Sequence, residues 1–314
     1  MAYINEKILT SFVVDYTPPD EVFIADKILT NVPVSEISGK YTIWEKKEKK
    51  ITNDVVGYRA STPEIPLQRI PKKGTYATER HGLRDFISEE DAKTYKEYMD
   101  PVKEKAFGLK TQLMRNREKL VASTVASSTN VPSDSITKWD TDGATIQKDI
   151  SDAIQEFRKN SGVLPNTMII PWEVWEAIKL NEDLVESWGK IVKAQASPQV
   201  FTLASYFNLV FESIKTILIP TCQYDTTGKG ITEVSAPIWG DNVAFLYTTP
   251  KGTKNTFTWV ARFVKQELTT EVFPHYDKDI PGDWVKVYYE DDLQVVSDSC
   301  LYVIKDVLTG KKKN

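Results

Sequence analysis

The chain has 314 residues, of which 41% are hydrophobic, enough to form a substantial core in two domains or in one elaborated domain. Its net charge of −4 at neutral pH argues against a general DNA-coating role, because such a role needs a basic surface that releases counterions. No apolar run approaches membrane-spanning length, and two distant cysteines without CxxC spacing indicate neither a disulfide framework nor a zinc site. We therefore expect no membrane contact, and synthesis without a leader segment in a reducing cytoplasm.

Residues 1–35 are predicted to form an N-terminal arm. Prolines at positions 18, 19 and 33 interrupt regular structure, and a short helix is expected between them, from Asp20 to Leu29.

Residues 36–86 are typical of a charged arm of two strands. Tyr41 and Ile43 alternate with polar positions as in a half-buried strand, whereas the Lys and Glu cluster at 45–50 and three later prolines indicate an exposed edge. Because a two-stranded ribbon is barely stable alone in water, we expect a neighbouring subunit to support it. Aromatic groups without a core favour contacts between subunits, and packing within the arm is the alternative. The candidate contact residues are Tyr41, Trp44, Lys46, Lys47, Lys49 and Lys50.

A long amphipathic helix is predicted within residues 88–128. Asp100 is a good N-cap, and Pro101 fits the first helical position because its missing N–H loses no bond there. An earlier turn at Ser88 resembles a capping box, so helix is expected to begin there and to be offset at Pro101. Apolar residues recur at spacings of three and four. They are Val102, Ala106, Leu109, Leu113, Leu120 and Val121.

The rest of the chain alternates helices and strands in an α+β order. A helix at 143–160 buries a face of Ile146, Ile150, Ala153, Ile154 and Phe157, and Gly162 ends it. Pro171 opens a helix that carries Val174, Trp175 and Ile178. A further helix is expected at 199–207. Strands or strand-like apolar runs are expected at 167–170, 209–220, 238–247, 256–268, 284–289 and 299–304.

Enzymatic motifs are not found. The two histidines, His81 and His275, belong to no HExxH pattern or other close ligand pair, and no P-loop, GxGxxG or GxSxG motif occurs. The glycines around Lys229 read as a turn. Adjacent acidic residues such as Asp277 and Asp279 are more typical of loop charges than of acid and base catalysis. We therefore predict no catalytic residue, no cofactor-binding residue, no metal ligand and no cofactor.

Several segments together resemble the major capsid proteins of tailed phages with the HK97-like fold. The arm with Tyr41 and Trp44 and the turn-back at Arg80-His81-Gly82-Leu83 resemble its E-loop, and the long helix resembles its spine helix. The helix after Asp149, the turn at Pro165-Asn166 and the strand 168–170 are similar to its A-domain. A second helix and strand set follows at 203–210 and 238–247.

This resemblance implies an α+β HK97-like capsid fold and a subunit that assembles into the icosahedral head shell around a double-stranded DNA genome. It implies an N-terminal arm that lies along a neighbouring subunit, and late strands that return to the spine helix. The implied partners are copies of the chain in hexamers and pentamers, a portal, a separate scaffolding protein, decoration proteins and weakly contacted DNA. The implied location is the virion, with assembly in the host cytoplasm. The implied divisions are an N-terminal arm at 1–35, an E-loop at 36–86, a P-domain at 87–135 and 255–309, an A-domain at 136–254 and a tail at 310–314.

Three alternatives stay open. An encapsulin-like nanocompartment shell would enclose an enzyme cargo instead of DNA. A head-completion or tail component would form rings or tubes. A hydrolase with a carboxylate site would be a monomer or small oligomer with turnover.

Overall fold

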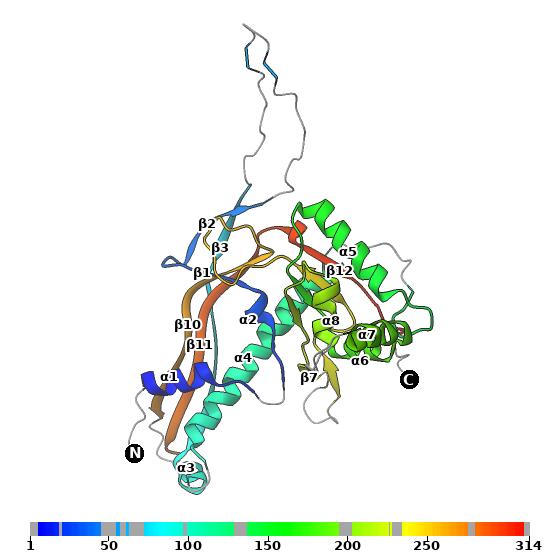
Figure 1. The fold of residues 1–314 in the computed structure, drawn as a ribbon. Helices are drawn as coiled ribbons and strands as arrows, with labels where there is room; N and C mark the ends of the chain where they lie inside the picture. The colour runs from blue at the N-terminus through cyan, green and yellow to red at the C-terminus, as the bar shows by residue number, and fades with distance from the viewer. Residues whose placement is uncertain are drawn as a thin grey trace.

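The computed structural model describes most of the chain, and only these residues are discussed below. They are residues 6–18, 21–44, 55–56, 61–62, 72–96, 99–128, 137–194, 203–225, 227, 234–275 and 280–310. Two four-stranded sheets lie side by side, and a long helix runs from the far end of one sheet to the other (Figure 1).

The first of these, here called the long sheet, has the strand order β1-β10-β11-β4. The parallel pair β1–β10 is short, whereas β10, β11 and β4 are long and antiparallel. Register shifts after Val264 and after Gln266 introduce irregularities that favour bending of β10, consistent with the curvature in Figure 1. The bounds are β1 Thr30–Pro33, β4 Glu79–Ser88, β10 Val260–His275 and β11 Gly282–Val295.

Helices cover one face of the long sheet. The helix α4 (Pro101–Ala126) begins as predicted, because the Asp100 carboxylate accepts hydrogen bonds from the N–H groups of Val102 and Lys103. The predicted earlier start is also confirmed, as α3 (Glu89–Tyr95), capped by the Ser88 hydroxyl. The packed side chains include Ile87, Ala106, Leu113, Val285 and Val287.

The N-terminal segment differs from the prediction in two ways. A helix, α1 (Glu6–Asp15), was not expected, and the helix expected from Asp20 to Leu29 is reduced to α2 (Ala25–Ile28). Moreover, α1 packs on its own chain: the Thr10 hydroxyl bonds to the main chain of Thr270, where β10 has no strand neighbour. Residues 6–15 and β1 therefore pack on a free sheet edge of their own chain, and the expectation that this arm also lies along a neighbouring subunit stays a prediction.

The second sheet, here called the compact sheet, has the order β12-β9-β5-β6 and is covered on both faces. Met168 and Phe245 point to the face covered by α5, α6 and α8. Ile169 and Ala244 point to the opposite face, where the end of α4 packs. The bounds are α5 Ile146–Ser161, β5 Thr167–Ile169, α6 Trp172–Leu180, α7 Glu182–Ala194, α8 Leu203–Val210, β6 Thr216–Leu218, β9 Val243–Leu246 and β12 Leu301–Ile304.

Most predicted elements of this part are present, with three corrections. The strand expected at 209–220 is confined to β6, because Leu209 and Val210 continue α8. The helix α7 was not predicted. The last strand, expected to lie beside the spine helix with the other late strands, pairs with β9 in the compact sheet after a 3-10 turn at η1 (Asp298–Cys300), and from that sheet it packs on the end of α4. Gly162 ends α5 as predicted, with a left-handed backbone φ of 81°.

Two hairpins complete the architecture. The predicted two-stranded arm is present as β2 (Ser38–Ile43) paired with β3 (Lys72–Ala77), but residues 79–88 leave it and join the long sheet as β4. A smaller hairpin pairs β7 (Gln223–Asp225) with β8 (Ser235–Pro237).

Candidate functional site

The base of the β2–β3 hairpin is built from two matching Gly-x-Tyr segments. In the antiparallel register Gly39 faces Tyr76 and Tyr41 faces Gly74. Each tyrosine ring lies over the glycine of the other strand, and a Cβ placed on Gly39 would come within 2.6 Å of the Tyr76 hydroxyl oxygen. Glycine is therefore required at both positions, since any larger residue would displace a ring.

Both rings pack on the long sheet of the same chain. The Tyr76 ring stacks on Phe263 with centroids 4.4 Å apart, and the Tyr41 ring is tilted against Phe263 at 5.1 Å. Tyr41 is only 6% exposed. The expectation that Tyr41 lacks a core of its own is thus wrong, because Phe263 provides one. The repeated Gly-x-Tyr pattern was a signal in the sequence that could have revealed this pairing.

Trp44, directly after β2, is bound to the residue that follows β11 and to the segment before β10. Its backbone N–H donates to the Val296 carbonyl at 2.9 Å, and its indole N–H donates to the Asn255 carbonyl at 3.1 Å. The ring meets Phe257 edge-on and stays half-buried. Trp44 retains exposed surface, so its role between subunits stays a prediction. The four predicted contact lysines, Lys46, Lys47, Lys49 and Lys50, lie outside the described residues.

The other side of the hairpin base is held by acceptors on β11. The backbone N–H of Ala77 donates to the Asp292 carboxylate at 2.8 Å, and the Thr78 hydroxyl donates to the Glu290 carboxylate at 3.2 Å. Thr78 also donates its N–H to the Ile37 carbonyl at 2.7 Å. The long sheet therefore sets the direction in which the arm starts.

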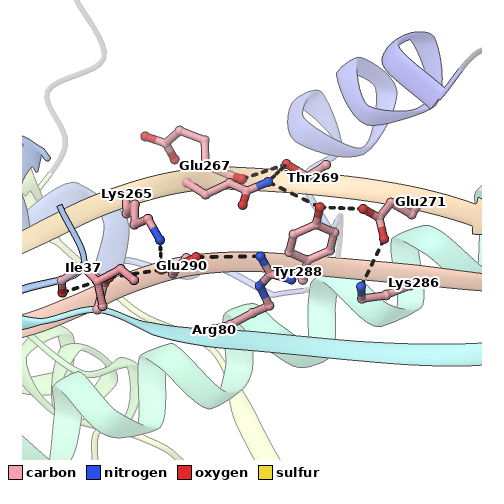
Figure 2. A network of polar contacts seen from close by, with 11 residues as sticks. Ile37, Arg80, Lys265, Glu267, Thr269, Glu271, Lys286, Tyr288 and Glu290 are labelled. Carbon is pink, nitrogen blue, oxygen red and sulfur yellow. Dashed lines mark hydrogen bonds and ion pairs between the residues drawn. The ribbon is translucent and has the colours of Figure 1, made fainter. Parts of the chain in front are cut away.

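The sheet face opposite α4 carries a ladder of alternating charges (Figure 2). Lys265 Nζ donates to Glu290 at 2.6 Å, and Arg80 approaches the other Glu290 oxygen at 3.8 Å. Farther along, Glu271 accepts from the Tyr288 hydroxyl at 2.6 Å and from Lys286 at 3.0 Å. The hydrogen bond from Tyr288, followed by that from Lys286, holds the pKa of Glu271 below its usual value.

Beneath α4 a buried ionic cluster ties four segments together. Asp291 on β11 accepts from Arg262 Nε at 2.5 Å and from Arg117 at 3.2 Å. Arg117 also donates to Asp26 at 2.8 Å, and its guanidinium carbon lies 4.1 Å from the centre of the Tyr289 ring. A carboxylate shared by two guanidinium groups can be buried at a much lower cost in free energy than an unpaired charge.

Glu118, one residue along α4, binds the N-terminal segment and the region of the compact sheet. Its carboxylate accepts from the backbone N–H groups of Ile24 and Ala25, the latter at 2.8 Å, and from the Trp239 indole N–H at 2.6 Å. Burial raises its pKa, although these hydrogen bonds oppose the shift. Sequence reasoning missed this residue, yet its spacing to Val121 and Ala122 on the apolar face was a signal.

Neither the histidines nor the cysteines form a reactive group within the described part of the chain. The His81 ring lies against Tyr289, and the His275 ring against Phe86 and Trp284. Cys222 and Cys300 are buried, and no disulfide joins them. In the part of the chain that the structure describes, no group of three or more His, Cys, Asp or Glu side chains is placed to hold a metal ion. No helix of that part is long and apolar enough to cross a membrane.

Comparisons with known proteins agree with this architecture. Neither a protein-family model nor a curated protein sequence matches the chain. A phage-related protein from Bordetella bronchiseptica superposes with a TM-score of 0.67 at 16% identity, over 99% of this chain and 100% of that chain. For the capsid of the cyanophage P-SCSP1u the TM-score is 0.55 at 11% identity, over 92% of this chain and 89% of that chain. The chain has the HK97-like fold.

A third solved structure extends the comparison beyond phages. A virus-like particle from Pyrococcus furiosus superposes with a TM-score of 0.57 at 13% identity, over 95% of this chain and 98% of that chain. The predicted fold class is therefore confirmed.

Proposed function

We propose that this chain is the major capsid protein of a tailed phage, a structural subunit that assembles into the icosahedral head shell around a double-stranded DNA genome. The observation that carries the proposal is the likeness, over about nine tenths or more of both chains, to the cyanophage capsid and the phage-related protein. The role proposed is structural, without catalysis.

The two sheets suggest how the domains divide, and this division forms part of the proposal. The long sheet with α3 and α4 forms the P-domain, and α1 with β1 belongs to it. The compact sheet with α5 to α8 forms the A-domain, which takes β12 from the C-terminal segment. The E-loop is then limited to the hairpin that begins at β2 and ends at β3. These units replace the boundaries expected at 1–35, 36–86, 87–135, 136–254 and 255–309.

The geometry supports a subunit that holds its shape while it makes many weak contacts. Closed symmetry repeats each contact many times, so that modest free energies per contact suffice. The ionic cluster at Asp291 and the Glu118 contacts join the N-terminal segment, the spine helix and both sheets. Anchoring of the hairpin by Tyr41, Tyr76 and Trp44 fixes where the E-loop begins.

The partners follow from this role. The subunit is proposed to form hexamers and pentamers with its own copies, and to assemble in the host cytoplasm with a portal and a separate scaffolding protein. The mature shell is the virion capsid, where the chain touches DNA weakly and non-specifically and offers its outer surface to decoration proteins. A net charge of −4 supports weak DNA contact, since tight coating would need a basic chain.

Electron microscopy of the purified protein, with and without its coexpressed neighbouring genes, tests the proposal. Closed polyhedral particles are expected. Rings or tubes would instead indicate a head-completion or tail component. Monomers alone in both preparations would contradict the proposal that the chain forms a shell.

The contents of the particles distinguish a phage capsid from a nanocompartment shell. A virus-like particle is also among the similar structures, so a nanocompartment shell with other contents stays the second candidate. Particles from infected cells that hold nuclease-protected double-stranded DNA would support the capsid. Particles that hold a single enzyme and no nucleic acid would support the nanocompartment.

A further inference from the structure

The helix α1 is apolar on two sides, although its own chain covers only one. Leu9 and Val13 are fully buried where α1 packs against α4 and β10. Ile8 and Phe12, one residue earlier in each case, are 51% and 48% exposed and form a second apolar stripe one turn apart. Two large apolar side chains side by side in water form an exposed patch, and such a patch favours a covering partner.

A matching hollow lies at the same end of the molecule. A pocket of about 390 Å³ opens between α3, the first turn of α4 and the end of β4. Its apolar lining includes two side chains that are exposed to about one half, Tyr95 and Met99. This volume exceeds that of a phenyl ring. The remaining lining residues are Phe86, Ile87, Asp91, Pro101, Glu104 and Lys105.

One chain cannot bring its own stripe to its own pocket. Phe12 lies beside Lys103, whose ammonium group is 4.6 Å from the centre of the ring. The pocket is lined by Pro101, Glu104 and Lys105. At 100° per residue these three project from the other side of α4, roughly 100 to 200° around the helix from Lys103. The stripe and the pocket therefore face different directions.

The charges around the two surfaces are complementary. The first turn of α3 is acidic, with Glu89, Glu90 and Asp91. On the pocket wall Glu104 is acidic, and the charge of Lys105 is paired with Asp85. Beside the stripe, Lys103 covers the Phe12 ring and Lys7 is exposed on α1. Opposite charges around an apolar contact favour one orientation and one partner.

We infer that the Ile8–Phe12 stripe of one copy packs into the α3–α4 pocket of a second copy. This inference rests on the proposed shell function and names one of its contacts. Because the two surfaces differ, the contact is heterologous, and its repetition leads around a ring or across a lattice. A single contact of this size is weak, so it acts only as one of many in an assembly.

Cross-linking between two variants tests the contact. Phe12→Cys and Tyr95→Cys, one of them tagged, are assembled together and treated with a short bismaleimide. The native cysteines are buried and should not react. A tagged–untagged heterodimer is expected only in the mixture. Phe12→Cys mixed with Leu180→Cys, whose site is 82% exposed on α6, is the matched control and should give none.

The outcomes separate the inference from the proposed function. Shells without the heterodimer overturn the inference alone. Dimers of Phe12→Cys with itself also overturn it, because they show the stripe packing on its own copy. Unmodified protein that never forms shells overturns the proposed function, and a heterodimer in such a preparation would still support the contact.

A charged substitution gives an independent measure. The Phe12 side chain is half-exposed in the subunit, so Phe12→Asp should leave folding intact, as judged by circular dichroism and thermal unfolding. It is expected to raise the protein concentration needed for assembly at least about tenfold, as the loss of a central apolar contact does. Leu180→Asp should leave that concentration unchanged. Equal behaviour of the two variants would contradict the inference.

Discussion

All residues of β5, β9 and β12 in the compact sheet are buried, whereas β4, β10 and β11 of the long sheet expose one face and carry ion pairs along it. Helices cover both faces of the compact sheet, so short strands suffice and apolar packing holds them. The long sheet has helices on one face only. There, buried arginine–carboxylate pairs and a surface charge ladder add to the apolar packing under α4. We expect the free energy of unfolding to depend on the volume of buried side chains in the compact sheet and on ion pairs in the long sheet.

The largest effect should come from a cavity in the compact sheet. Phe245 is fully buried on β9, and Phe245→Ala should lower the free energy of unfolding by about 4 kcal/mol, because the surrounding side chains close the cavity only in part. Urea unfolding of unassembled subunits measures this loss. Leu180→Ala, at an exposed site, is the control and should change the free energy by less than about 0.5 kcal/mol. A loss for Phe245→Ala no larger than that would contradict the comparison.

The next largest effect is expected from the ionic cluster of the long sheet. Asp291→Asn removes the charge shared by Arg117 and Arg262 and should cost about 3 kcal/mol, since two guanidinium groups then lack their buried partner. The same urea titration measures it. Glu186→Gln breaks an exposed pair with Lys190 and should leave the unfolding midpoint unchanged. If both variants behave alike, buried pairing does not stabilise the long sheet.

A smaller effect should follow at the hairpin base. Gly74→Ala places a methyl group against the Tyr41 ring and should cost about 2 kcal/mol through overpacking. Gly108→Ala on α4 is the opposite case: nothing lies within 4 Å of the added carbon, and the helix should gain up to about 1 kcal/mol. Differential scanning calorimetry would show the two melting temperatures moving in opposite directions. A shift of the same sign would show that the ring does not constrain Gly74.

The smallest effect concerns pH, and its sign differs between two carboxylates. The pKa of Glu271 is lowered in the fold, so its contribution is present above the unfolded value of about 4.3 and disappears as the pH falls through the folded value. The stability difference between the unmodified chain and Glu271→Gln, under about 1 kcal/mol at neutral pH, should shrink as the pH falls through the lowered pKa.

Glu118 should show the reverse dependence. Burial raises its pKa, so its contribution is fully present below the unfolded value and is lost as the pH rises through the folded value. The stability difference between the unmodified chain and Glu118→Ala should therefore grow on acidification. Urea unfolding at several pH values measures both stability differences. If the two differences change with pH in the same direction, the opposite pKa shifts of Glu271 and Glu118 are contradicted.

The sequence by itself determined the elements whose signals are local. The cap at Asp100, the offset at Pro101, the end of α5 at Gly162 and the strand 167–169 depend on neighbours a few residues away, and all are present. The HK97-like fold was also predictable, because the order and spacing of these elements resemble those of known capsid proteins.

Only the tertiary structure decided which surface each element meets. Tyr41 is buried because Phe263, 222 positions later, supplies its core, and β12 joins the compact sheet because β9 offers a free edge. The carboxylate of Glu118 gathers donors from residues 24, 25 and 239. Such contacts join segments that are far apart along the chain, and local periodicity carries no information about them. For the same reason, the stripe on α1 and the pocket beside α3 became visible only once the chain was folded.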